Sequence, residues 1–119
     1  MSQNFQAGDF LIFQIESGFG LLRLLAIEEY DGAAVWHIAG YEDLFPDPET
    51  LDIALSSPEK LKIDLPHAAL TTRAFEATQV ARMLNVPLTE EELSAYKEWQ
   101  NSPEREISDR SVRLMLGLR

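Results

Sequence analysis

Four side chains in this sequence are candidates for acid–base or anion-binding chemistry. They are Arg23, His37, Tyr41 and His67. A histidine titrates near neutral pH and can act as a general base when a carboxylate orients it, and a guanidinium binds anions. In a functional interpretation, these four residues line a ligand pocket between a sheet and its helices.

Three of these residues, Arg23, His37 and His67, also have a structural interpretation, which we favour. Arg23 is the only base among the first 59 residues, and it lies inside the apolar run 21–27. Because an unpaired buried charge is very costly, we expect Arg23 to pair with an acid from a helix or to contact an anion. His37 is expected in mid-strand within reach of Glu28, where its hydrogen bonds would be satisfied. His67 follows another predicted strand and is given the same structural interpretation.

The motifs of common catalytic and cofactor sites are missing from the sequence. There is no cysteine, and neither histidine has a partner at the HExxH or HxH spacing of zinc sites. No GxSxG, Walker-type or GxGxxG motif occurs, and Gly18-Phe19-Gly20 has no third glycine and no helix after it. We therefore predict no metal and no cofactor, and we favour a non-catalytic function.

Charge is distributed unevenly along the chain. The sequence holds 20 acids and 10 bases, and residues 1–60 alone carry 11 acids and two bases. This excess repels phosphate backbones, so no nucleic-acid partner is expected, and it can attract a basic protein or simply keep the protein soluble. The predicted partner-binding residues follow the third predicted strand and are Glu42, Asp43, Asp47, Glu49 and Asp52. They lack the order of a calcium loop.

Three apolar runs at the start of the chain predict a meander of three strands. The runs cover residues 9–15, 19–29 and 34–41, and Ser17-Gly18 and Asp31-Gly32 separate them. Glycine accepts the positive φ that two-residue hairpin turns require, so both connections are expected to be tight.

Tight turns also predict which residues pair across the meander. With two-residue turns, paired residue numbers sum to 35 in the first hairpin and to 63 in the second. His37 then lies opposite Ala26 and diagonal to Glu28. One face is expected to hold Leu11, Phe13, Ile15, Leu22, Leu24, Ala26, Val35, His37, Ala39 and Tyr41. The other is expected to hold Phe10, Ile12, Gln14, Leu21, Arg23, Leu25, Ile27, Trp36 and Ile38. Both sets are largely apolar, so we expect a sheet that is covered on both sides or rolled up.

The second half of the chain predicts one more strand and several helices. Asp47 and Pro48 begin a short helix to residue 55, and residues 61–65 alternate as a half-buried strand. Apolar residues at helical spacing predict a helix from Thr71 or Thr72 to residue 84. A capping box of Thr89 and Glu92 begins a helix to about residue 100, and a last helix is expected from 108 or 109 onward.

Together these elements predict one α+β domain over residues 1–119. Its sheet is an antiparallel meander of three to four strands, bent or barrel-like, followed by three to four helices.

The first two predicted strands carry a resemblance to a known family. Gly8-Asp9-Phe10 opens the first strand and the run from Gly18 to Leu25 opens the second, as in immunity-protein-26-like proteins of bacterial polymorphic toxin systems. The resemblance covers about 40 residues. It implies a bacterial, non-enzymatic inhibitor that binds a toxin domain, and it carries over no catalytic residues.

Two functions are therefore predicted. The first is a protein-interaction module with an acidic docking surface for a basic protein, of which an immunity-type inhibitor is one form. The alternative is a small-molecule binding domain or an enzyme that uses the four-residue pocket. Self-association through Trp36 or Trp99 is a third prediction. The chain shows no leader or membrane span, so we expect a cytoplasmic protein without a membrane partner.

Overall fold

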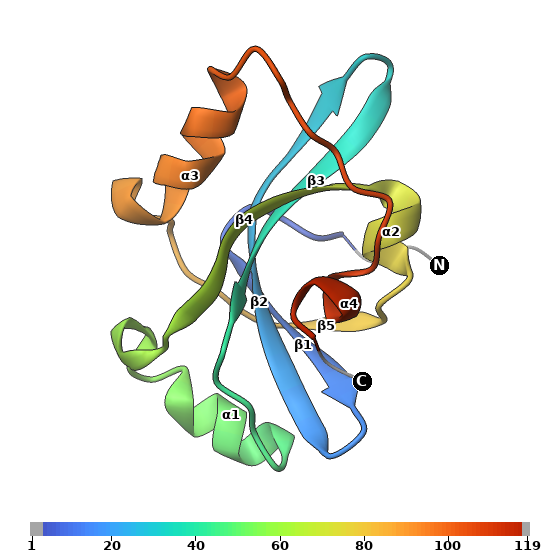
Figure 1. The fold of residues 1–119 in the computed structure, drawn as a ribbon. Coiled ribbons are helices and arrows are strands. Elements are labelled where there is room, and N and C mark those ends of the chain that lie inside the picture. Colours follow the sequence, from blue (N-terminus) through green and yellow to red (C-terminus); the bar gives the residue numbers. More distant parts are fainter. Residues whose placement is uncertain (1–3, 118–119) are drawn as a thin grey trace.

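The protein folds around an antiparallel sheet of five strands, and the computed structural model describes residues 4–117 (Figure 1). The strands are β1 (Asp9–Ile15), β2 (Gly18–Tyr30), β3 (Ala33–Tyr41), β4 (Ile63–Thr71) and β5 (Val80–Asn85). Their order is β4-β3-β2-β1-β5, so β4 and β5 form the two edges of an open sheet. The predicted α+β class and the meander are confirmed.

Four helices lie on the two faces of this sheet. They are α1 (Pro48–Ala54), α2 (Thr72–Glu76), α3 (Glu90–Gln100) and α4 (Val112–Met115), and a 3₁₀ turn covers Pro58–Lys60. Helices α1 and α3 lie on one side of the sheet, and α2 and α4 lie on the other (Figure 1). Within the described part of the chain, no helix has the length and apolar character that crossing a membrane requires.

Each face of the sheet has its own hydrophobic cluster, as the two apolar faces predicted. The cluster under α2 and α4 contains Leu11, Phe13, Ile15, Leu22, Leu24, Ile38, Ala68, Leu70, Ala74, Phe75 and Val112. The cluster under α1 contains Phe10, Ile12, Leu21, Tyr41, Phe45, Leu51 and Leu55. Burial of these side chains is the main force that holds the helices against the sheet.

The first hairpin has a register two residues away from the predicted one. Ile15 pairs with Gly18 and Phe10 with Arg23, so paired numbers sum to 33 and the turn is Glu16-Ser17. Gly18 is the first residue of β2, and the position requires glycine because a Cβ there would lie 2.3 Å from the Phe45 carbonyl oxygen. A shift of two residues leaves every side chain of this hairpin on its predicted face.

The second hairpin has the predicted register near its turn and a β-bulge farther along. Ala26 pairs with His37, as expected, and Asp31 and Gly32 make the turn with positive φ angles of 54° and 83°. The register then shifts between Leu24 and Ala26, so Leu24 pairs with Ile38. The bulge adds one residue to β2. Beyond it, the β3 side chains that were predicted to lie on one face of the sheet lie on the other. Ile38 therefore packs with Leu24 in one core, while Tyr41 packs in the other.

The segment 72–84, predicted as one helix, is a helix of five residues followed by a strand. Helix α2 ends at Glu76, and β5 pairs antiparallel with β1, for example Phe10 with Leu84. Helical spacing over a short run is a weak signal, and the unpaired edge of β1 offers backbone hydrogen bonds that outweigh it.

Two other boundaries in the second half differ from the prediction. Strand β4 is longer than the predicted 61–65, since it continues to Thr71. Helix α4 begins at Val112 after Ser111, and Ser108 instead bonds to the edge of β4. The Ser108 carbonyl accepts from the Thr71 amide at 3.0 Å, and the Ser108 amide donates to the Ala69 carbonyl at 2.8 Å. These two bonds cover part of an edge that would otherwise be open.

The two helices with clear start signals lie where they were predicted. The Asp47 carboxylate accepts from the Thr50 amide at 2.7 Å and caps α1. The capping box at α3 is complete, because Thr89 and Glu92 bond to each other's backbone amides.

Candidate functional site

The four residues of the predicted ligand pocket fall into two groups in the structure. Arg23 and Tyr41 both contact the Phe10 ring, whereas His37 and His67 bond to each other. Both groups lie beneath α3, whose side chains Glu92, Tyr96 and Trp99 complete them.

Arg23 is an internal anchor between the sheet and α3. Its side chain is 2% exposed, and its guanidinium lies 4.1 Å above the Phe10 ring. The Nε atom donates to Glu92 Oε2 at 3.1 Å, Nη2 donates to Glu92 Oε1 at 3.3 Å, and Nη1 donates to the Gly8 carbonyl. Arg23 therefore pairs with an acid from a helix, as its structural interpretation expected, and it adds no free positive charge to the surface.

Glu92 has two partners, and both act on its charge. Burial acts to raise the pKa of its carboxyl, but hydrogen bonds from Arg23 and from the Thr89 amide outweigh burial and hold the pKa below its ordinary value. The Glu92 carboxylate thus completes the capping box and also neutralises Arg23.

Tyr41 is a buried phenol beside this pair. Its ring stacks on Phe10 with the centroids 6.1 Å apart, and the residue is 4% exposed. Burial raises the pKa of Tyr41 to about 12, in spite of the nearby Arg23 charge. A neutral, buried tyrosine that packs in a core is not available as a proton donor to a solvent-borne ligand.

His37 is the centre of a hydrogen-bonded row of three side chains. Its Nε2 lies 2.8 Å from Glu28 Oε1 and its Nδ1 lies 2.9 Å from His67 Nε2, while the residue is 0% exposed. The rings of Tyr96 and Trp99 cover it, with centroids 4.4 Å and 4.6 Å away. The contact between Glu28 and His37 follows from the predicted register.

The contact with His67 could not be predicted from that register, because β4 was expected to end at residue 65. His37 pairs with Ala69 in the observed ladder, which brings His67, two residues earlier, to the same face. The signal was the apolar run that follows His67, and the structure shows that it continues the strand.

Both histidines resist protonation. Burial lowers the pKa of His37, although the Glu28 carboxylate acts in the opposite direction. Burial, together with the nearby His37, lowers the pKa of His67 to about 4. The Glu28 carboxylate can only accept, so a neutral His37 donates to it from Nε2 and accepts at Nδ1 from His67. Neither histidine is therefore tuned as a general base for neutral pH.

His67 is the member of this row that also lines a surface groove. The groove has a volume of about 710 Å³ and runs between β4 and the segment 106–110, with Trp99 and Met115 among its walls. Arg23, His37 and Tyr41 are not among the residues that line it. In the part of the chain that the structure describes, no group of three His, Asp or Glu side chains is arranged to hold a metal ion.

The five predicted partner-binding acids differ in whether their carboxylates are engaged in hydrogen bonds within the protein. Asp43 accepts a hydrogen bond from the Lys62 amide at 2.7 Å, and Asp47 caps α1. Hydrogen bonds from the Thr50 hydroxyl and amide lower the pKa of Asp47. The other three, Glu42, Glu49 and Asp52, are exposed.

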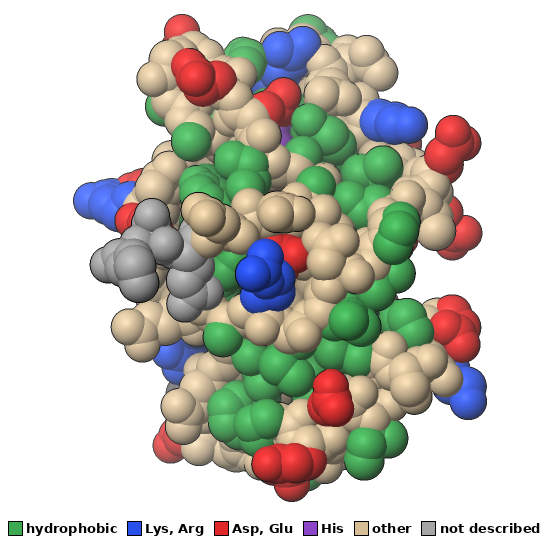
Figure 2. All heavy atoms as spheres, turned by 180° about the vertical axis from the view of Figure 1, so that it is seen from behind, with side chains coloured by type: hydrophobic (Ala, Val, Ile, Leu, Met, Phe, Trp, Pro, Cys, Tyr) green, Lys and Arg blue, Asp and Glu red, His purple; other side chains and the backbone are tan. Residues whose placement is uncertain are grey.

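Large apolar side chains are exposed among these acids. Ile53 on α1 is 73% exposed, and Leu44 in the preceding loop is 48% exposed. Glu49 and Ile53 are four residues apart on α1, so they share one side of the helix. Figure 2 shows hydrophobic side chains between acidic ones at the lower end of the molecule, where Figure 1 places α1. We call this region the α1 surface and define it by Glu42, Leu44, Glu49, Asp52 and Ile53.

Comparison with known proteins adds no relative. No family model matches the chain, and neither a curated protein nor a solved structure is significantly similar to it. The resemblance of the first two strands to immunity proteins therefore stays a prediction.

Proposed function

We propose that this protein is a non-catalytic protein-binding module whose α1 surface binds a basic protein. The observation that carries the proposal is that residues 42–53 expose two large apolar side chains, Leu44 and Ile53, together with the acids Glu42, Glu49 and Asp52. Protein interfaces commonly combine an apolar centre with a polar rim, and the rim charges select and steer the partner.

The charge around this surface supports a basic partner. Residues 42–64 hold seven acids and two bases, and the one other base of the N-terminal half, Arg23, is buried against Glu92. The field at this end is therefore negative, with Lys60 and Lys62 as the local exceptions.

The candidate catalytic residues support a non-catalytic role. Arg23 and His37 are packed among protein groups that satisfy them, and the pKa of His67, at about 4, makes its imidazole a weak base. An inhibitor that binds a basic toxin domain in a bacterial cytoplasm is the specific form that the resemblance of the first two strands favours.

The proposal is tested by capture from a cell lysate followed by charge reversal. The tagged protein is used as bait at low and at high salt, and captured proteins are identified by mass spectrometry. We expect a basic protein that is held at low salt and lost at high salt. The triple variant E42K/E49K/D52K should lose it, because three attractive charges become repulsive.

A matched triple variant controls for net charge. Glu76, Glu98 and Glu104 are exposed acids outside the α1 surface, so E76K/E98K/E104K changes the total charge equally. Asp43 and Asp47 are left intact because they hold backbone amides. Equal capture by both variants, with circular dichroism showing both folded, would refute the proposal.

Apolar contact is tested separately with Ile53→Ser and Leu44→Ser. If the exposed pair forms the centre of the interface, each substitution should weaken capture at a salt concentration where charge is screened. Because both side chains are exposed, thermal stability should change little.

The predicted alternative is ligand binding between sheet and helices, and among its four predicted residues His67 lines a groove, beside Trp99. Ligand binding there should change Trp99 fluorescence, and His67→Gln should weaken it. Self-association through the tryptophans has less support, since Trp36 stacks on Phe75 with centroids 4.2 Å apart and Trp99 covers His37.

A further inference from the structure

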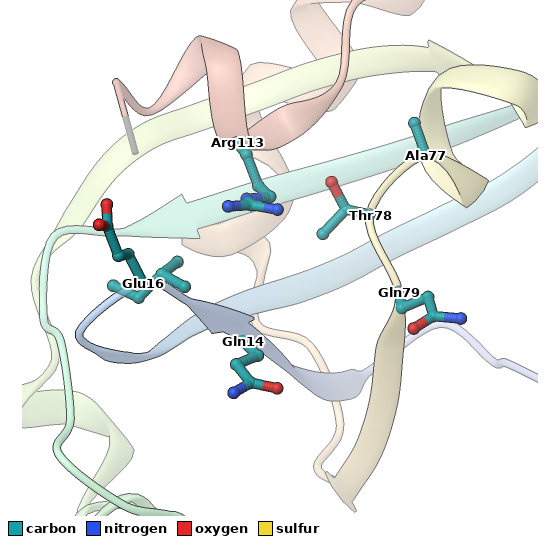
Figure 3. Close-up of a pocket in the computed structure, with 7 residues that line it drawn as sticks. Gln14, Glu16, Ala77, Thr78, Gln79 and Arg113 are labelled. Carbon is teal, nitrogen blue, oxygen red and sulfur yellow. The ribbon is translucent and has the colours of Figure 1, made fainter. Parts of the chain in front are cut away.

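A second cavity lies on the opposite side of the sheet from α1, between the end of β1, the segment joining α2 to β5, and α4 (Figure 3). Its volume is about 580 Å³, which is within the range of small-ligand sites. The polar residues that line it are Gln14, Glu16, Thr78, Gln79 and Arg113.

Two polar groups in this cavity are buried without a partner. Thr78 is 3% exposed, and its hydroxyl has no hydrogen-bond partner among the described residues. The Nε atom of Arg113 is likewise buried and unpaired within residues 4–117. The two side chains face each other in Figure 3. Native proteins rarely leave buried polar groups unsatisfied, because the lost hydration is not recovered.

The chemistry of this pair defines what could satisfy it. A guanidinium has only donors, and its planar fork matches a carboxylate, while the threonine hydroxyl can donate to the same anion. One guanidinium balances one negative charge. Glu16 also lines the cavity, with its carboxylate turned away from Arg113 and Thr78 in Figure 3, and its charge disfavours a dianion such as phosphate.

We propose that this cavity binds a small monocarboxylate, with the Arg113 guanidinium and the Thr78 hydroxyl on the carboxylate. This site is independent of the α1 surface, so either can fail without the other.

The proposal is tested by titrating the isotope-labelled protein with acetate and lactate at constant ionic strength, observed by amide NMR. Saturable shifts are expected at the amides of Thr78, Gln79 and Arg113. Lactamide, which has nearly the same shape as lactate but no charge, should cause none. Shifts with lactamide equal to those with lactate, or no saturable shift with either acid at millimolar concentrations, would overturn the proposal. Tighter binding of inorganic phosphate would overturn the assignment to a monocarboxylate.

Substitutions at Thr78 separate a ligand site from a site that a water molecule satisfies. Thr78→Val keeps the shape and removes the unpaired hydroxyl, so the melting temperature should rise while carboxylate binding weakens about tenfold. Thr78→Ser should restore binding. A fall in melting temperature for Thr78→Val would show that the hydroxyl is already satisfied and would contradict the proposal.

The charged residues supply the remaining controls. Arg113→Gln should abolish binding, whereas Glu16→Gln should tighten it by removing a repulsive charge. Arg110→Gln changes an exposed arginine that does not line this cavity, so it should leave binding unchanged. Loss of binding in Arg110→Gln as large as in Arg113→Gln would show a general charge effect and overturn the assignment.

Discussion

Arg23 and Glu92 form the ion pair on which the docking of α3 depends. Arg23→Ala should lower the free energy of unfolding by about 3–5 kcal/mol, because it leaves the Glu92 carboxylate and the Gly8 carbonyl without their donor. Urea denaturation followed by circular dichroism measures the change.

Glu92→Gln tests the charge of the pair at the same contact. Glutamine can still complete the capping box, but the buried Arg23 charge is left without its counter-charge. A loss of about 3–5 kcal/mol is expected. A loss much smaller than that of Arg23→Ala would mean that the packing and hydrogen bonds of the arginine, not the charge of the pair, carry the effect.

The histidine row predicts how stability depends on pH. The folded protein holds the pKa of His67 at about 4, against an ordinary value of 6.5. Between these values the unfolded chain binds a proton that the folded protein excludes, so stability is full above pH 6.5 and falls as the pH drops toward 4. The unfolding free energy should decrease by about 1–2 kcal/mol from pH 7 to pH 5, after allowance for partial exposure of the ring.

His67→Gln isolates this effect. The variant keeps a hydrogen-bonding side chain but cannot titrate, so the loss of stability between pH 7 and pH 5 should shrink to the part that His37 contributes. His37 also has a lowered pKa and acts in the same direction. Equal stability of the wild-type protein at both pH values would contradict the prediction.

Among the elements, the junction of the first hairpin with the loop before α1 has no room for a larger side chain. The Phe19 amide donates to the Phe45 carbonyl at 2.8 Å, and the Phe45 amide donates to the Phe19 carbonyl at 2.9 Å. A Cβ at Gly18 would meet that Phe45 carbonyl oxygen at 2.3 Å. Gly18→Ala should therefore break this bridge and lower the unfolding free energy by about 2 kcal/mol, measured by urea denaturation.

Gly40→Ala is the matched control for this junction. Its new Cβ would lie 2.9 Å from Leu116, at the end of a flexible side chain that can move. We expect Gly40→Ala to cost clearly less stability than Gly18→Ala. A larger loss of stability in Gly40→Ala would show that the contact with the Phe45 backbone is not the more restrictive of the two.

Elements with local signals were predictable from the sequence, and elements that depend on distant partners were not. Apolar runs predicted the first three strands, with Asp31-Gly32 as the second turn, and caps predicted the starts of α1 and α3. Strand β5 is a strand because β1 pairs with it, and no local pattern records that pairing. The β-bulge at Leu25 also has no local signature, yet it decides which core receives Trp36 and Ile38.

In the candidate sites, too, local contacts could be predicted from the sequence and contacts between distant segments could not. The contact between Glu28 and His37 lies within one hairpin and could be predicted, whereas His67 joins them only through the longer β4. The cavity with Thr78 and Arg113 could not be predicted at all, because a predicted helix through residue 84 places Thr78 on a different backbone.

For the whole molecule, the net charge of −10 predicts a dependence of stability on salt. Mutual repulsion of the acids destabilises the compact state, and salt screens it. Raising sodium chloride from low to near-physiological concentration should raise the melting temperature in a calorimeter. The E76K/E98K/E104K variant, with less net charge, should respond less. A melting temperature that falls with added salt would contradict this.

The pairing of β1 with β5 has a consequence for synthesis of the chain. The outer edge of β1 receives its partner only when residues 80–85 have left the ribosome, about 70 positions after β1 itself. Until then the emerging strand carries Phe10, Leu11, Ile12 and Phe13 beside an open row of backbone groups. Such an edge attracts other nascent strands, so the interval before β5 emerges is when this protein most needs protection by a chaperone.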